Sequence, residues 1–105
     1  MEMTAKNARI PALLLAVDRE QAVGHELKLE LDGYAVTTVS SVDEALARAK
    51  VSHPLVVFAA EPRLAQAIVR VAVREPALAG IPVIGLAQGT GRAILLKPAL
   101  HPLAS

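Results

Sequence analysis

Apolar residues along the chain follow two patterns: short continuous runs, and runs that repeat every three or four residues. Continuous apolar runs of strand length occur at 12–17, 55–60 and 81–87, and residues 34–39 are β-branched and alternating. A last short run, 93–97, ends in a lysine. Unbroken apolar runs are typical of strands buried on both faces of a sheet. The pattern therefore predicts five strands.

Residues 18–32 follow a helical pattern. Their apolar residues recur every four positions, at Val23, Leu27 and Leu31. Asp18 stands where a side-chain oxygen can cap the first turn. Gly33 can end the helix in the left-handed conformation, which glycine adopts easily. The sequence therefore predicts a helix with an apolar stripe.

Two more helices are predicted between the later strands. Ser41 and Glu44 have the spacing of a capping box at the start of residues 40–50. In residues 64–75 the apolar positions Leu64, Ile68 and Val71 fall on one helical face. Strands that alternate with helices are typical of an open, mostly parallel α/β sheet. The 105 residues have room for one domain, and the polar residues 1–9 are expected to be frayed.

The last connection is too short for this regular alternation. Five residues, 88–92, separate Ala87 from Ala93, whereas a parallel crossover normally takes about a dozen or more. The last strand therefore either returns as an antiparallel hairpin, with QGTG as the turn, or runs back extended and keeps the parallel order. The length favours the hairpin. Exchange of this strand between two subunits is a third arrangement.

The composition excludes several classes of function. Lys and Arg number 11 against 10 Asp and Glu, and the chain has one Tyr and one Phe, so neither a basic patch nor a base-stacking platform for nucleic acid is expected. There is no cysteine, which removes thiolate chemistry. No apolar run approaches the roughly 20 residues that span a bilayer. His25, His53 and His101 lack metal-ligand spacing. We expect a cytoplasmic protein without metal, cofactor or membrane contact.

Several stretches resemble the receiver domain of bacterial response regulators. The resemblance covers residues 12–98, and its most specific parts are EPALAGIPVIGLA and a strand ending in Lys-Pro, AILLKP. It implies a flavodoxin-like (CheY-like), doubly wound sheet of five strands in the order 2-1-3-4-5. It also implies a site at which a working receiver is phosphorylated on an aspartate with the help of Mg²⁺.

The key positions of that site are only partly kept. Asp18 falls on the first of two Mg²⁺-binding acids, and Lys97 falls on the family's lysine. Arg19 replaces the second acid, Ala60 the phosphoacceptor aspartate, and Ala87 a Ser or Thr. Phosphoryl transfer needs an oxygen nucleophile, and a guanidinium group opposes a hard dication. The resemblance therefore implies a pseudo-receiver.

The charged residues near the lost acceptor allow two interpretations. Glu61 is expected to be a poor acceptor, because a one-residue shift on a strand normally turns the side chain to the opposite face. It can be an acidic filler, since the loop at the strand's end can bend the side chain back. Lys97 would be the remnant of an anion-binding lysine, neutralised by Asp18 or Glu61. Alternatively, it only extends from the strand end into solvent. The hairpin arrangement would carry Lys97 to the opposite end of the sheet and remove it from the remnant site.

Two helices of the family's arrangement, the fourth and the fifth, are missing from the pattern. The last two strands should therefore be partly uncovered. This gives the interface candidates Val83, Ile84, Leu86, Ile94, Leu95 and Leu96. We expect a second subunit, in a homodimer, or another signalling protein to supply the cover.

Three functions remain open. The first is a pseudo-receiver of two-component signalling (a phosphorelay) that is not an enzyme, is not phosphorylated and acts through protein–protein contacts as a dimer. The second is a receiver that still responds to phosphoryl donors or small anions through Asp18, Arg19 and Lys97. The third, an unrelated small-ligand or nucleotide binder of flavodoxin-like fold, rests on architecture alone.

Overall fold

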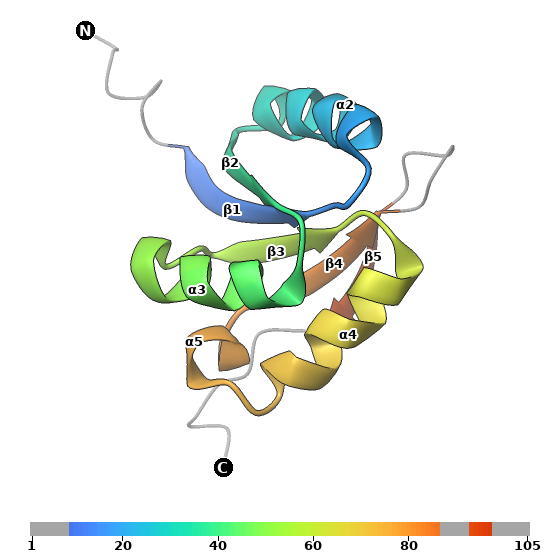
Figure 1. The fold of residues 1–105 in the computed structure, drawn as a ribbon. Coiled ribbons are helices and arrows are strands. Elements are labelled where there is room, and N and C mark those ends of the chain that lie inside the picture. The colour runs from blue at the N-terminus through green and yellow to red at the C-terminus, as the bar shows by residue number, and fades with distance from the viewer. Residues whose placement is uncertain (1–8, 87–92, 98–105) are drawn as a thin grey trace, which may run out of the picture.

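The computed structural model describes residues 9–86 and the backbone of residues 93–97. These residues form helices packed on the two faces of one sheet (Figure 1). The strands are β1 (Ile10–Leu15), β2 (Tyr34–Val39), β3 (Val56–Ala59), β4 (Val83–Leu86) and β5 (Ala93–Lys97). The helices are α2 (Arg19–Leu31), α3 (Val42–Ser52), α4 (Pro62–Ala72) and α5 (Pro76–Ala79).

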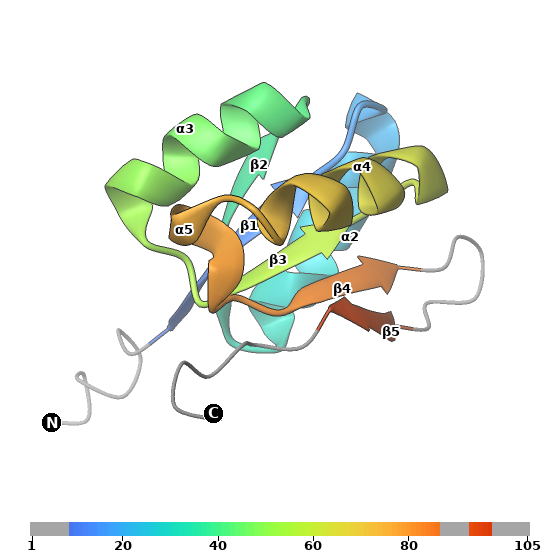
Figure 2. The same ribbon diagram turned by 90° about the horizontal axis from the view of Figure 1, so that it is seen from below.

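The sheet has the order β2-β1-β3-β4-β5. β1 pairs in parallel with β2 and β3, and β3 pairs in parallel with β4. This confirms the α/β class and the parallel order 2-1-3-4, which is compatible with a flavodoxin-like fold. β5 runs antiparallel to β4, as Figure 2 shows, with Lys97 opposite Val83 and Ala93 opposite Leu86. The hairpin alternative is therefore confirmed and the parallel one is wrong, because the connection is too short for a crossover.

Alternate residues of β1 divide the core into two clusters, because successive side chains of a strand point to opposite faces. Leu13 and Leu15 pack with residues of α3, α4 and α5, whereas Ala12 and Leu14 pack with α2. Figures 1 and 2 agree that α2 is the one described helix on its side of the sheet. We call that side the α2 face and the other side the covered face.

The helix ends follow the sequence signals. The Asp18 carboxylate accepts hydrogen bonds from backbone N–H groups of the first turn of α2, as predicted. Gly33 follows α2 with φ of 102°, the left-handed region that favours glycine. The Ser41 hydroxyl accepts from the Glu44 N–H at 3.1 Å, and the Glu44 carboxylate accepts from the Ser40 N–H at 3.0 Å. The predicted Ser41 cap is therefore confirmed, but the Glu44 carboxylate reaches the N–H of Ser40 and not that of the N-cap residue Ser41.

The covered face is more complete than predicted, because α5 was not expected. Glu75 precedes the helix and Pro76 opens it, a position where proline is tolerated because its missing N–H would have had no helical partner. Leu78 of α5 is fully buried in the cluster that also contains Val83 and Ile68. The prediction that Val83 is partly uncovered is therefore wrong: α4 and α5 enclose it.

On the α2 face the helix is confirmed, but its predicted apolar stripe does not pack on the sheet. α2 buries Ala22 and Leu29, which are seven residues apart and therefore on one side of the helix. Val23, Leu27 and Leu31, which we call the α2 ridge, are 62%, 60% and 80% exposed. Helical periodicity identified the helix correctly. However, α2 carries two apolar stripes, and the residues spaced four apart form the exposed stripe.

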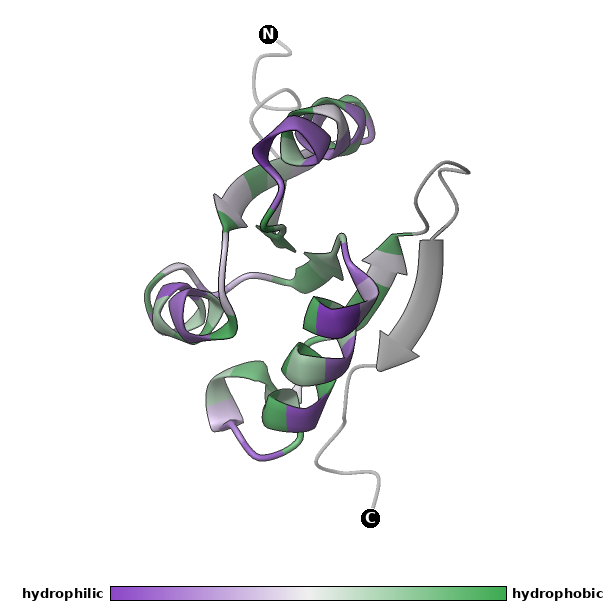
Figure 3. Cartoon of the chain, turned by 45° about the vertical axis from the view of Figure 1, so that its right-hand side comes forward, coloured by the Kyte–Doolittle hydropathy of each residue, from purple (hydrophilic) through white to green (hydrophobic). Residues whose placement is uncertain are grey.

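The hydropathy of the residues differs between the strands and the helices. Figure 3 shows hydrophobic residues, in green, along β1, β3 and β4, whereas the helices show both green and purple residues. Within the described part of the chain, no helix has both the length and the hydropathy needed to cross a bilayer.

Candidate functional site

The first candidate site lies at the carboxyl ends of β1 and β3, where the receiver resemblance placed the phosphorylation machinery. β1 and β3 are paired neighbours, so the residues that follow them meet at one edge of the sheet. The Glu61 carboxylate accepts hydrogen bonds from the backbone N–H groups of Val17 (3.2 Å) and Asp18 (3.3 Å). Glu61 therefore turns toward the loop after β1 and fills this edge, as predicted.

Asp18 is also engaged with backbone donors. Its Oδ1 accepts from the N–H groups of Glu20 (3.0 Å) and Gln21 (3.4 Å), and Arg19 begins the helix that it caps. Both carboxylates of this edge thus stabilise main-chain turns. Among the described residues, no group of three or more His, Cys, Asp or Glu side chains has the arrangement of a metal site.

Ala60, at the phosphoacceptor position, is fully buried. Its N–H donates to the Leu15 carbonyl at 2.9 Å, and it belongs to the apolar cluster under α2. A methyl group offers no lone pair to phosphorus. The acceptor position therefore has a packing role, and the neighbouring Glu61 oxygens already hold backbone N–H groups.

The lysine of the predicted remnant site lies elsewhere. The backbone of Lys97 pairs with Val83, where β4 begins, whereas Asp18 and Glu61 follow the carboxyl ends of parallel strands. The remnant-site prediction is therefore wrong for Lys97, because an antiparallel β5 carries its last residue to the opposite edge. Ala87 lies outside the described residues.

A hollow of about 330 Å³ lies at the same carboxyl edge, between α2 and β2. The Thr38 hydroxyl donates to the Glu26 carboxylate, and the Ser40 hydroxyl donates to Glu44 at 3.2 Å. Arg19 also lines the hollow. Two carboxylates face one guanidinium here, and Glu61 and Asp18 add two more nearby. This charge arrangement disfavours the phosphates of a nucleotide.

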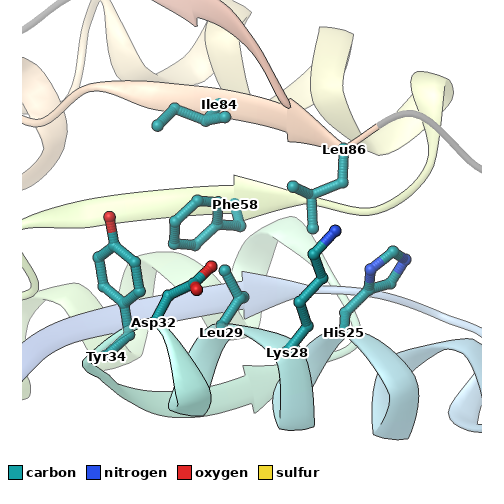
Figure 4. Close-up of a pocket in the computed structure, with 8 residues that line it drawn as sticks. All are labelled: His25, Lys28, Leu29, Asp32, Tyr34, Phe58, Ile84 and Leu86. Atoms are coloured by element: carbon teal, nitrogen blue, oxygen red, sulfur yellow. The ribbon is translucent and has the colours of Figure 1, made fainter. Parts of the chain in front are cut away.

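The second candidate site is a groove of about 210 Å³ on the α2 face, which we call the α2 groove (Figure 4). Its floor is apolar and comes from one helix and three strands: Leu29, Tyr34, Phe58, Ile84 and Leu86. Tyr34 and Phe58, the two aromatic residues of the chain, meet edge to face with ring centroids 5.1 Å apart. The rim is polar and belongs to α2: His25, Lys28 and Asp32.

The α2 groove marks the part of the sheet that α2 does not reach. Ile84 and Leu86 are half-buried, as predicted for interface candidates. The side chains of Ile94, Leu95 and Leu96 lie outside the described residues. The rim residues were not predicted, because only the direction in which α2 lies on the sheet brings them beside β4.

We compared the chain with models of protein families, with curated proteins and with solved structures, and none of the three comparisons gives a match.

Proposed function

We propose that the protein is a pseudo-receiver: a receiver-like signalling module that is not phosphorylated and acts through protein–protein contacts made by its α2 face. The observation that carries this proposal is the unequal covering of the sheet. In the described part of the chain, three helices pack on one face and one helix packs on the other. The α2 groove and the α2 ridge are the result.

The size and polarity of the exposed surface support a protein partner. The ridge residues are each at least 60% exposed, and fully burying one such side chain contributes about 1.5–3 kcal/mol. Apolar surface of this kind, rimmed by polar residues, is typical of protein interaction sites. The groove, at about 210 Å³, is smaller than the roughly 300–1,000 Å³ of small-molecule pockets.

The carboxyl edge supports the absence of phosphoryl chemistry. Ala60 supplies no nucleophile, and the Glu61 and Asp18 carboxylates accept hydrogen bonds from backbone N–H groups. Within the described residues, no buried side-chain nitrogen or oxygen lacks a hydrogen-bond partner. Binding chemistry is therefore favoured at the α2 face, not at this edge.

A peptide selection tests this function. A displayed library of helical peptides is panned on the wild-type chain and counter-screened on Leu86→Lys, which puts a charge on the groove floor. We expect enriched peptides that bind the wild type and lose binding to the variant, because an apolar helix face requires an apolar groove.

The control places the same charge on the covered side. Val51 of α3 is also exposed, so Val51→Lys should retain every enriched peptide. Peptides that bind both lysine variants equally, or no enrichment at all, would contradict the α2 face as the binding surface. Thermal unfolding of each variant checks that it is folded.

A further inference from the structure

We propose that the outer side of β2 receives an extended segment of another protein as an added strand, and that this segment places a basic side chain in the hollow between α2 and β2. The outer side of β2 is the side that faces away from β1. It is a different surface from the α2 groove, whose floor extends toward β4. Its role would therefore be additional to the function proposed above.

The hydrogen bonds between β1 and β2 show which backbone groups point outward. β2 is the first strand of the sheet and has a neighbour on one side only. The carbonyls of Gly33 and Val39 accept hydrogen bonds from N–H groups at the two ends of β1, at 3.0 and 2.9 Å. In a parallel pair, residues that bond to the neighbour alternate with residues whose backbone groups point the other way. The N–H and C=O groups of Val36 and Thr38 therefore point away from β1.

These four outward groups have no hydrogen-bond partner among the described residues. Tyr34 has the same orientation as Val36 and Thr38, and its carbonyl accepts from the Arg9 guanidinium, outside the sheet, at 3.5 Å. A row of unpaired N–H and C=O groups along a strand is a template for pairing with another chain. The main chain of β2 can therefore bind an extended segment without any change in its bonds to β1.

β2 lacks the features that normally protect the outermost strand of a sheet. Such strands carry lysine or proline, or a bulge, which oppose pairing with other chains. The six residues of β2, YAVTTV, contain neither a charge nor a proline, and their register with β1 is unbroken from Tyr34 to Val39. On the opposite side of the sheet, β5 has a register shift against β4 and ends in Lys97, which Pro98 follows. β2 is therefore the outermost strand that is suited to strand addition.

The position of α2 favours a linear segment over a second copy of this chain. Of the strands, β2 lies closest to α2, and the Thr38 hydroxyl donates to Glu26 of that helix. Two β2 strands paired about a two-fold axis would run antiparallel and keep both α2 helices on the same face. Paired strands lie about 4.8 Å apart, whereas packed helices need about 8–10 Å between their axes. The two helices would therefore collide, and a segment without a helix would not.

The hollow of about 330 Å³ beside β2 indicates the charge of the segment. Glu26 and Glu44 line it together with the aliphatic Val17 and Val23, and Arg19 is the one cation among its described lining residues. Each carboxylate accepts a hydrogen bond from one hydroxyl group, and a carboxylate can accept further ones. An excess of carboxylates beside an apolar wall suits the aliphatic stem and the charged end of a lysine or arginine.

A selection of short linear peptides tests the added strand. A displayed library is panned on the full wild-type chain and counter-screened on Val36→Pro, which removes one outward N–H and no bond to β1. We expect enriched peptides in which aliphatic or β-branched residues alternate and a lysine or arginine recurs. Their binding to Val36→Pro should be weaker by about tenfold or more. Leu86→Lys, in the α2 groove, should bind them as the wild type does. This control separates failure here from failure of the function proposed above.

Methylation of the peptide backbone makes the test independent of any variant that fails to fold. One amide nitrogen of an enriched peptide is methylated at a time, and binding to the wild type is followed by fluorescence anisotropy. Binding should be lost at every second position, because alternate N–H groups of an added strand face β2. No enrichment, equal binding to Val36→Pro, or losses that do not alternate would overturn strand addition.

Glu26→Gln tests the basic side chain. It removes a charge from the hollow and keeps an acceptor for Thr38, so a lysine peptide should bind several-fold more weakly, whereas its norleucine analogue should not change. Glu30→Gln, at an exposed residue of α2 that does not line the hollow, is the matched control and should leave both peptides unchanged. Equal effects of the two glutamine variants would contradict the basic residue. Sedimentation that shows self-association of the wild type, abolished by Val36→Pro, would make a second copy the occupant and overturn the linear segment.

Discussion

The two faces of the sheet are formed by the same strands, but helices cover them to different extents. On the covered face, α3, α4 and α5 enclose a cluster with Ile68, Leu78 and Val83 at its centre, each fully buried. On the α2 face a single helix covers β1 and part of its neighbours. The half-buried Ile84 and Leu86 remain at the edge of that cover.

The difference between the two faces shows which of them leaves apolar surface exposed to solvent. Parallel strands are apolar on both faces and need a layer on each. One face meets this requirement within the chain, and four residues of α5 are enough to complete it. Within the described residues, the other face leaves apolar side chains exposed on both the sheet and the outer side of α2, which supports the proposal that another polypeptide covers it.

The largest expected effect compares the same substitution on the two faces. Leu78→Ala should lower the free energy of unfolding by about 2–5 kcal/mol, because it leaves a cavity among fully buried side chains. Leu86→Ala, on the α2 face, should cost less than half as much, since the side chain is already partly in water. Urea unfolding at low protein concentration measures both. Equal costs would contradict the difference between the faces.

A smaller effect is expected at the carboxyl edge, which belongs to neither face. Glu61→Ala should lower the free energy of unfolding by about 1–3 kcal/mol, because two backbone N–H groups lose a charged acceptor. Glu61→Gln should recover part of the loss.

The control for this edge is another half-buried glutamate. Glu75 precedes α5 and makes no side-chain capping bond, so Glu75→Ala should cost clearly less in the same urea experiment. If the two alanine variants were equally destabilised, the hydrogen bonds of Glu61 would not be the cause.

Gly24→Ala should raise the free energy of unfolding by about 1 kcal/mol, because alanine has the higher helix propensity and a Cβ at position 24 meets nothing within 4 Å. Thermal unfolding measures the change. Ala47→Gly, on an exposed position of α3, should lower the free energy of unfolding by a similar amount. A loss of stability in Gly24→Ala would contradict an open environment around this position.

The smallest effect is expected from phosphoryl analogues. Beryllofluoride or acetyl phosphate with Mg²⁺ should not shift the melting temperature, because Ala60 has no oxygen to bind them. A reproducible upward shift that disappears in Asp18→Asn would revive the second function considered from the sequence.

The parts of the fold with local signals were predictable. Unbroken apolar runs identified the strands, Asp18 and Ser41 identified two helix starts, and the short connection favoured an antiparallel β5. The side on which a helix rests was not predictable. The spacing of Val23, Leu27 and Leu31 gives a helix, but the buried residues are Ala22 and Leu29, and only the shape of the sheet decides between the two stripes.

The candidate sites were likewise predictable only where a local sequence signal exists. Glu61 was placed correctly as an acidic filler, because a loop after a strand can turn a side chain back toward the next one. α5 was missed because four residues carry no periodicity, although Pro76 and Gly80 bracket it. Without α5, Val83 could not be recognised as buried, and the groove rim depended on the orientation of α2.

The reactivity of a single cysteine on each side of the molecule tests the account most directly. Lys28→Cys and Val51→Cys put a thiol on the rim of the α2 groove and on α3, in a chain that has no other, at positions that are both exposed in the single chain. Maleimide labelling is followed as a peptide enriched in the helical selection is added. The account predicts that the thiol at position 28 becomes several-fold slower to react while that at position 51 does not change. Equal labelling rates at both positions over the whole titration would contradict it.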